Sequence, residues 1–224
     1  MDNHCSETRI KINLEEIIKS EKPVVLELGC GRKKYDFNTD GRIGIDRLDL
    51  TNVDIVTDIE NGLSYLPDNS VDEIYCKSLL EHIKNFENLM REIVRVLKKS
   101  GTYNVFVPHF SNPYYYSDYT HIRFFGLYTF YYFCSDKYQL SRKVPDFYTD
   151  IRIKILRQRL KFRSPFKSRH LFKQFLQLVI NLHSSVQEFY EENLCYIFPC
   201  YGLEVVFTPD SDYSSEKGEQ QTKF

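Results

Sequence analysis

Short apolar runs recur along the first half of the chain, separated by polar residues and glycines. Each run holds four to six residues and is rich in Val and Ile, so it is too short for a helix and typical of a buried parallel strand. Five such strands are predicted, at residues 24–28, 42–45, 53–56, 71–76 and 102–107. The first half of the chain is therefore expected to build a sheet.

Between the last two of these strands, the apolar positions change to helical spacing. They are Phe86, Leu89, Met90, Ile93, Val96 and Leu97. Lys98 and Lys99 close the predicted last turn and Gly101 lies just past it, as is typical of a helix C-terminus. A strand–helix–strand unit of this kind indicates a parallel sheet.

Two further elements are predicted before and after this unit. An amphipathic entry helix is expected before Pro23, from Ile12, Leu14, Ile17 and Ile18. The chain shows no internal repeat and no second domain boundary. We expect a single domain over residues 1–208, with a cofactor-binding half at about 12–108 and an acceptor-binding or lid region at about 109–200.

The C-terminal third carries three more predicted elements. Apolar and basic residues alternate over 151–163, which predicts a strand, and a phase break near Leu156 indicates a bulge. Residues 168–192 are predicted to be helical, with a stripe formed by Leu171, Phe172, Phe175, Leu178, Val179 and Leu182. A last strand is predicted at 203–208, and the polar tail at 209–224 is expected to be disordered.

The first predicted strand leads into a glycine loop, Gly29-Cys30-Gly31. Glycines at such a turn let the backbone approach a ligand, and an acidic residue after the next strand suits ribose hydroxyls; Asp46 occupies that position. A dinucleotide is the weaker interpretation. Lys34 stands where the third glycine of that fingerprint belongs, and the ten or so residues after Gly31 look like a turn rather than a helix.

The ordered motifs resemble class I S-adenosylmethionine-dependent methyltransferases. The motifs are E-L-G-C-G, G-I-D, V-T-D-I, L-P-D-N-S-V-D-E-I-Y, L-L-E-H-I and R-E-I-V-R-V-L-K-K-S-G, within residues 22–133. They are similar to the small-molecule, type 11-like branch. The resemblance implies an α/β, Rossmann-like, mostly parallel seven-stranded sheet with an antiparallel last strand. The helices after the first two strands look shortened, and an aromatic-rich insert follows the fifth.

The resemblance also implies a set of residues that bind S-adenosylmethionine. These are Glu27, Gly29, Gly31, Asp46, Asp58, Ile59 and Ser78. Glu27 is expected to organise the loop and the cofactor's amino group, Asp46 to bind the ribose hydroxyls, and Asp58 with Ile59 to meet the adenine. Ser78 is expected to contribute a backbone contact at the carboxyl end of the fourth strand.

Methyl transfer to a hydroxyl also needs a base, and an imidazole is well suited to that role. His109 directly follows the fifth strand. Asp118 and His121 lie in Y-S-D-Y-T-H-I-R-F-F, which resembles D-P-T-H-x-R-F-F segments of methyltransferases associated with glycan assembly. We assign His109, His121 and Asp118 as catalytic candidates, with His82 of L-E-H as a further option. Their spacing matches no known metal pattern, so no metal is assigned.

Two regions leave alternatives open. Twelve of the 24 residues from Phe110 to Phe133 are aromatic. They predict either a hydrophobic cap on the sheet or a lid that walls an acceptor pocket. From Arg142 to Lys173, eleven Lys or Arg residues face two acidic ones, which indicates either a charged edge strand or an anionic substrate such as RNA.

Composition narrows the function further. The net charge of −1 gives no global attraction to nucleic acid. The resemblance to glycan-associated methyltransferases implies a small-molecule or glycan acceptor as the partner. No apolar run is long enough for a membrane span, no signal peptide is recognisable, and the six cysteines are expected to be free thiols, so we expect a cytoplasmic protein. The leading hypothesis is O-methylation of a sugar or glycan precursor. The alternatives are an RNA methyltransferase and a catalytically silent scaffold. The intact glycine loop argues against the scaffold.

Overall fold

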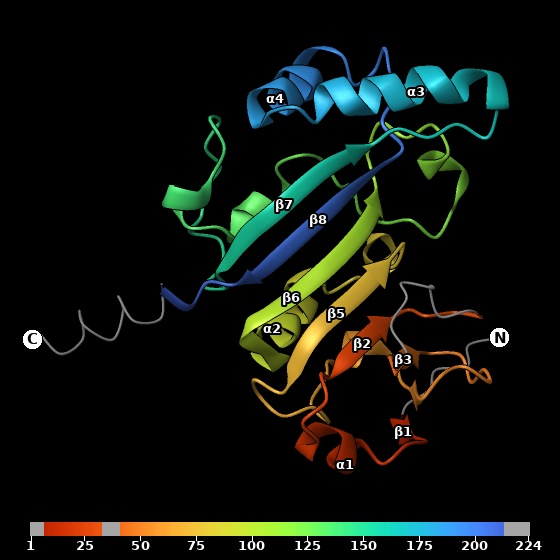
Figure 1. Ribbon diagram of the computed structural model, residues 1–224, viewed down its shortest axis with the longest axis vertical. Helices are drawn as coiled ribbons and strands as arrows, with labels where there is room; N and C mark the ends of the chain where they lie inside the picture. Colours follow the sequence, from red (N-terminus) through yellow and green to blue (C-terminus); the bar gives the residue numbers. More distant parts are fainter. Residues whose placement is uncertain (1–6, 33–40, 213–224) are drawn as a thin grey trace, which may run out of the picture.

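The computed structural model describes residues 7–32 and 41–212. Within them, eight strands form one sheet in the order β1-β4-β3-β2-β5-β6-β8-β7 (Figure 1). The strands are β1 (Arg9–Ile10), β2 (Val25–Leu28), β3 (Ile43–Asp46), β4 (Ile55–Val56), β5 (Val71–Lys77), β6 (Leu97–Pro108), β7 (Ile153–Lys161) and β8 (Gly202–Pro209).

The strand directions confirm the predicted Rossmann-like sheet. Strands β2 to β6 are mutually parallel, and the last strand, β8, runs antiparallel to β6 and to β7. The sheet has one strand more than predicted, because the two-residue β1 pairs antiparallel with β4 at the edge. Residues 47–54 contain no helix, as expected, whereas the short connection predicted after Gly31 falls on 33–40, outside the described residues.

The helices are fewer and shorter than the strands would need for a full doubly wound fold. The α-helices are α1 (Leu14–Lys19), α2 (Phe86–Val96), α3 (Lys167–Ile180) and α4 (Ser184–Asn193). Short 3-10 helices are η1 (Ile59–Asn61), η2 (Leu80–His82), η3 (Tyr115–Ser117), η4 (Thr129–Phe133) and η5 (Asp136–Tyr138). Figure 1 shows α3 and α4 beyond β7, at one end of the sheet.

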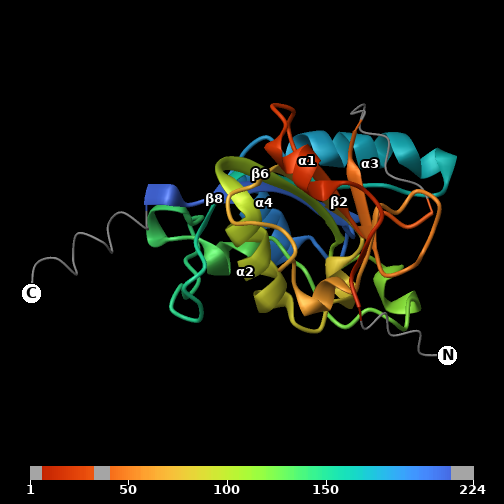
Figure 2. The same ribbon diagram turned by 90° about the horizontal axis from the view of Figure 1, so that it is seen from below.

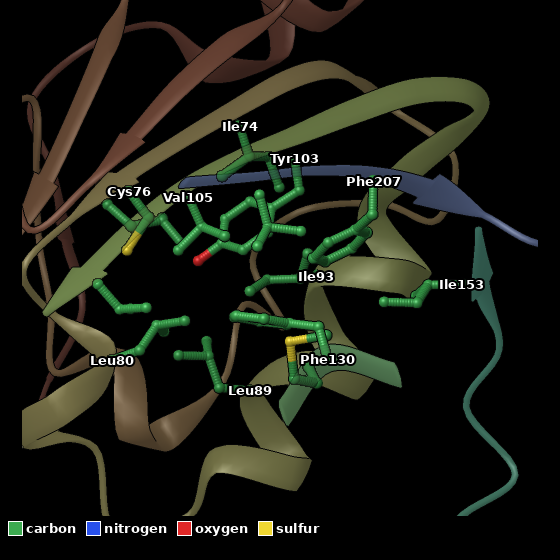
Figure 3. Packing of buried hydrophobic residues seen from close by; sticks show 14 of the residues in the cluster. Ile74, Cys76, Leu80, Leu89, Ile93, Tyr103, Val105, Phe130, Ile153 and Phe207 are labelled. Atoms are coloured by element: carbon green, nitrogen blue, oxygen red, sulfur yellow. The ribbon is translucent and has the colours of Figure 1, made fainter. Parts of the chain in front are cut away.

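The main core lies between the sheet and α2 (Figures 2 and 3). Asn85 caps the start of α2 by accepting a hydrogen bond from the Asn88 N–H, and the apolar face of the helix then meets β5, β6 and β8. Inside this core, the rings of Tyr103 and Phe207 lie 4.9 Å apart. The helix therefore fixes the positions of the central strands, whose carboxyl ends carry the predicted site.

The predicted helix over 168–192 is wrong in one respect, because it is two helices. The first helix ends at Asn181, where the chain turns. The Asn181 side chain accepts from the N–H of Leu160 and donates to the Leu160 carbonyl. His183 then caps α4 through Nδ1, which accepts from the Ser185 N–H. Gln177 likewise accepts from the N–H of Phe162. The two helices thus cover the exposed edge of β7 with side-chain hydrogen bonds.

Other details near the C-terminus follow the sequence more closely. The register between β7 and β8 shifts between Ile155 and Arg157, which confirms the bulge predicted near Leu156. Strand β8 continues to Pro209, and Asp210 is buried with its N–H bonded to the Arg152 carbonyl, so the ordered chain extends past the predicted start of the tail. Residues 213–224 lie outside the described residues.

The aromatic region from Phe110 to Phe133 serves two purposes in the structure. Its second half packs into the core, where the ring of Phe86 makes edge contacts with Phe125, Phe130 and Phe133 at 5.6 to 6.1 Å. Its first half lies over the carboxyl ends of β5 and β6 and lines a cavity there. The cap and the pocket wall, which the sequence left as alternatives, are thus two parts of one segment.

Two further expectations from the sequence concern the cysteines and membrane-spanning segments. Within the described ranges, all five cysteines are buried free thiols, and Cys5 lies outside them. Among the described helices, none has the length and apolar character that crossing a membrane requires.

Candidate active site

The predicted cofactor residues stand where the order of the parallel strands reverses. β2 pairs with β3 on one side and with β5 on the other, so Leu28 lies opposite both Ile45 and Cys76. The chain segments that follow these strands leave in different directions and frame a crevice outside the carboxyl ends. Gly29, Asp46 and Ser78 come within two residues of these positions.

The glycine loop has a backbone that favours glycine. Gly29 and Gly31 have φ angles of 68° and 57°, in the left-handed region that side chains disfavour. A Cβ atom on Gly29 would lie 3.0 Å from Leu79, so a side chain there would also crowd the start of the loop after β5. The N–H groups of the loop donate to the Ile45 carbonyl and to Asp46, so the glycines serve to keep side chains out of the way of a ligand.

Asp46 is tied to this loop by both of its carboxylate oxygens. Oδ2 accepts from the N–H of Gly31 at 2.8 Å, and Oδ1 accepts from the N–H of Leu48 at 2.9 Å. Each carboxylate oxygen has a second lone pair, so these bonds leave acceptor capacity for two ribose hydroxyls. The acceptor oxygens of Asp46 thus fit the nucleoside part of S-adenosylmethionine.

Glu27 has a buried partner that the sequence did not point to. Its Oε2 lies 3.6 Å from Nη1 of Arg42, and both side chains are buried. The guanidinium also stacks 4.1 Å over the ring of Tyr75. Arg42 thus balances the charge of Glu27 beneath the glycine loop. The signal in the sequence was an arginine at the entrance of a buried strand, where an unpaired cation would be costly.

The other predicted cofactor residues occupy the same sheet edge. Asp58 caps η1 by accepting from the Glu60 N–H, and Ile59 is buried. Ser78 has a φ of 52°, which is uncommon for a residue other than glycine, and its N–H donates to the Phe106 carbonyl. Backbone strain of this kind often marks a functional position. The roles of Asp58, Ile59 and Ser78 toward the cofactor stay predictions.

A cavity of about 740 Å³ opens next to Ser78. Its walls come from the ends of β5 and β6, the aromatic segment and the loop after β7. The lining includes Ser78, Glu81, His82, Phe106, Tyr114, Tyr115, Asp118, His121, Arg163 and Tyr201. The volume is in the range of small-molecule sites.

Two chain segments that are distant in sequence meet at one wall of this cavity. The N–H groups of Ile122 and Arg123 both donate to the Glu81 carbonyl. Arg123 in turn donates from Nε to the Ile83 carbonyl at 2.7 Å. These contacts hold the D-Y-T-H-I-R segment against L-E-H and bring His121 beside Glu81.

The resulting cluster contains acceptors that converge on one nitrogen. His121 Nε2 lies 3.5 Å from Asp118 Oδ2 and 3.9 Å from Glu81 Oε1. Glu81 is 1% exposed, and its Oε2 has no hydrogen-bond partner among the described residues. Burial, together with the charge of Asp118, raises the pKa of Glu81 to about 7. The carboxyl group of Glu81 can therefore change its protonation state near neutral pH.

The hydrogen bonds around the two histidines set their tautomers. Nδ1 of His121 lies 3.0 Å from the Tyr115 carbonyl, which can only accept, so this nitrogen carries the proton and Nε2 is free to take another. Nδ1 of His82 faces the Thr120 carbonyl and the Thr120 hydroxyl, which itself donates to Asp118. Burial lowers the pKa of His82. That hydroxyl bond lowers the pKa of Asp118.

His109, the other histidine predicted to be catalytic, does not line this cavity. Its ring is fully buried, Nδ1 lies 2.8 Å from the Ser111 hydroxyl, and Nε2 lies 2.9 Å from Glu191 Oε2. Both ring nitrogens are thus engaged, and the ring joins the end of β6 to α4. The structure brings His121 and Asp118 together and leaves His109 apart from them.

Glu81, His82 and His121 also offer three ligand atoms within 4.8 Å of one another, a geometry that a divalent cation could share. Glu81 was not predicted as a site residue. A carboxylate placed directly before His82 and just after a buried strand was the signal that could have identified it.

The raised pKa of Glu81 has a consequence for stability. Its pKa is about 7 in the folded protein against an ordinary value of 4.5, so its contribution is most favourable below pH 4.5 and is lost as the pH rises through 7. Glu81→Gln should therefore be more stable than the wild type at pH 8, by on the order of 1–3 kcal/mol, with a smaller difference at pH 5. Urea unfolding at both pH values measures this.

The matched control for this experiment is Glu87→Gln, on an exposed turn of α2. Glu87 forms only a surface ion pair with Arg91, so its substitution should change the free energy of unfolding by less than about 1 kcal/mol at either pH. An equal effect of Glu81→Gln at pH 5 and pH 8 would show that Glu81 titrates as an ordinary carboxylate.

Comparison with known proteins agrees with the geometry of this edge. Residues 26–105, about a third of the chain, match the family described as a methyltransferase domain. No curated protein sequence matches the chain.

Solved structures share the fold at low sequence identity. A SAM-dependent methyltransferase from Archaeoglobus fulgidus is similar with a TM-score of 0.50 and 16% identity, over 87% of this chain and 89% of that one. Coclaurine N-methyltransferase, solved with N-methylheliamine and SAH, has a TM-score of 0.49 and 18% identity, over 87% of this chain and 70% of that one. Residues 26–105 therefore resemble a methyltransferase domain, and the chain has the fold of a SAM-dependent methyltransferase.

Proposed function

We propose that the protein methylates a hydroxyl group of a small polar acceptor, a sugar or glycan precursor. The observation that carries this proposal is the cluster of Glu81, Asp118 and His121 in the wall of the cavity beside Ser78. A hydroxyl is a weak nucleophile and needs a base near its proton, whereas a neutral amine can attack without one. A base in the cavity wall therefore favours an oxygen acceptor.

His121 is the proposed base, and its neighbours position it. Its Nδ1–H bond to the Tyr115 carbonyl orients the ring so that Nε2 faces the carboxylates. When Nε2 takes the acceptor's proton, the carboxylates of Asp118 and Glu81 stabilise the imidazolium that forms. Asp118 and Glu81 thus act as positioning and charge-stabilising residues, in the manner of the acidic member of a triad.

Bound S-adenosylmethionine supplies an electrophilic methyl group on a sulfonium. Asp46, the glycine loop and Ser78 would hold it at the sheet edge. The acceptor oxygen would take the methyl group as the carbon–sulfur bond breaks, and His121 would take the hydroxyl proton. The products are the methyl ether and S-adenosylhomocysteine.

The lining of the cavity supports a sugar as the acceptor. Tyr114, Tyr115 and Tyr201 offer flat aromatic surfaces, and Arg163 adds a donor group for hydroxyl or phosphate oxygens. The D-Y-T-H-I-R-F-F segment, which resembles glycan-associated methyltransferases, contributes this very wall. RNA is less well supported on β7, where Arg157 and Lys161 share the carboxylate of Glu204.

The test is incubation with methyl-labelled S-adenosylmethionine and a panel of nucleotide sugars, lipid-linked sugars, amines and RNA. We expect the label in a sugar O-methyl group, identified by mass spectrometry. Label on nitrogen or on RNA would contradict the proposal.

Dialysis against EDTA separates the two chemistries that the cluster allows. Because Nε2 of His121 can take the acceptor's proton without a metal ion, we expect activity to persist without divalent ions. Loss of activity on chelation, restored by a divalent ion, would instead assign Glu81, His82 and His121 as metal ligands.

A further inference from the structure

The outward face of α3 is apolar. Leu171, Phe175, Leu178 and Leu182 follow one another at helical spacing and are 78%, 62%, 67% and 70% exposed. We call these four residues the outer stripe. The opposite face of the helix already packs on the domain through Leu176 and the buried Ile180. Helix α3 therefore has two apolar faces, and only one of them packs against the core.

The contrast with α2 shows that this exposure is not a general feature of the chain. Every large apolar residue of α2 faces inward, and its exposed positions are Glu87 and Arg91. The exposed apolar surface of α3 also continues past its own stripe, to Phe166 and Phe172, which are 53% and 50% exposed. A contiguous patch of this kind on one helix indicates a surface that binds something.

The charges on α3 itself are of one sign. Helix α3 contains Lys167, Arg169, His170 and Lys173 and no acidic residue. Arg163 adds a further cation just before it. Among the described residues, no carboxylate pairs with Arg163, Lys167 or Arg169. The apolar patch is thus bordered, toward the start of α3, by cations that lack a counter-charge in the protein.

We infer that α3 docks on the surface of a membrane that contains anionic phospholipids. The outer stripe would enter the boundary between head groups and acyl chains, and the basic first half of the helix would lie among the head groups. This arrangement of an apolar face with lysines and arginines beside it is the one that interfacial helices use. A second copy of the chain is a poorer occupant, because neither α3 would supply an acidic residue to the other.

Helix α3 lies near the cavity of about 740 Å³ beside Ser78, which we call the acceptor cavity. A second cavity, of about 430 Å³, lies under α3 and is lined by Phe172, Lys173 and Arg163 among others. It shares Arg163, Ser164 and Tyr201 with the larger cavity. A docked α3 would therefore hold the acceptor cavity close to the lipid surface. The docking itself does not depend on the proposed function.

The experiment is co-sedimentation of the full-length protein with vesicles. We expect binding to vesicles of phosphatidylcholine with phosphatidylglycerol, weaker binding to phosphatidylcholine alone, and loss of binding as salt is raised. The double variant Phe175→Ser, Leu178→Ser should weaken binding by about tenfold or more. Because both residues are exposed, its thermal unfolding temperature should not fall below that of the wild type.

Two controls make the result specific. Phe147→Ser removes a ring that is 76% exposed but lies outside α3, and it should leave vesicle binding unchanged. Lys167→Glu with Arg169→Glu should weaken binding to anionic vesicles only. The inference is overturned if the wild type fails to bind anionic vesicles or binds both vesicle types equally. A dimer that the Phe175→Ser, Leu178→Ser variant dissociates, without vesicle binding, would instead identify a second copy as the occupant.

Discussion

His121→Ala is expected to lower kcat by about 100-fold or more while the affinity for S-adenosylhomocysteine stays near that of the wild type. The ring lies in the cavity wall with Nε2 turned toward Asp118 and Glu81. Removing it takes away the proton acceptor but leaves the glycine loop and Asp46 untouched. The measurements are kcat against pH and calorimetric binding of S-adenosylhomocysteine. The variant should lose the part of the pH dependence of kcat that the imidazole confers on the wild type.

His109→Ala is the matched comparison, since both histidines were predicted to be catalytic. His109 is fully buried and joined to Glu191, so its loss leaves a cavity and an uncompensated carboxylate. We expect it to reduce the free energy of unfolding by about 2–4 kcal/mol and to leave kcat of the folded enzyme within a few-fold of the wild type. Full activity in His121→Ala, or a 100-fold loss in His109→Ala with its stability intact, would reverse the two assignments.

The cofactor half of the fold could be predicted because its signals are local. Strands β2 to β5 each contain a short apolar run, and the glycine loop follows the first of them within a few residues. The predicted boundary before β6 was wrong: Lys98, Lys99 and Gly101, expected at the end of the helix, lie in β6, which begins at Leu97 directly after α2. The bulge near Leu156 was equally visible, because a one-residue shift in register changes the face of every following side chain.

The acceptor side could not be predicted in the same way, because its contacts join distant segments. Glu81 meets His121 only because the segment around Ile122 bonds to the Glu81 carbonyl. Nothing in either motif alone indicates that contact. His109 shows the converse: it directly follows a central strand, yet Glu191, far along the chain, engages its ring and keeps it out of the cavity.

Helix α3 shows a third limit of sequence patterns. Leu171, Phe175 and Leu178 have the spacing of a core face, and periodicity cannot say whether a face meets the protein or another surface. The side-chain bonds of Gln177 and Asn181 to β7 decide the matter, because they turn the opposite face of the helix inward.

Asp46→Ala is expected to weaken binding of S-adenosylhomocysteine by roughly 1–3 kcal/mol, or about ten- to a hundredfold in Kd. The substitution removes the proposed acceptor of the ribose hydroxyls. It also leaves the N–H groups of Gly31 and Leu48 without their partners, so the loop loses the bonds that hold its shape. Calorimetry at fixed pH and salt measures the change, and NAD should not bind to the wild type or to the variant.

Two further variants separate the ribose contact from the loop contact. Asp46→Asn keeps the size of the side chain but replaces one acceptor by a donor, which would face the N–H of Gly31 or of Leu48, so its loss of affinity should approach that of the alanine variant. Asp49→Ala removes a half-exposed carboxylate in the same loop that pairs with Lys11, and its Kd should match the wild type. An unchanged Kd in Asp46→Ala would place the nucleoside elsewhere on the sheet, and tight binding of NAD would favour the dinucleotide interpretation of the loop. A loss of affinity in Asp49→Ala as large as in Asp46→Ala would mean that the loop as a whole, rather than the carboxylate of Asp46, determines binding.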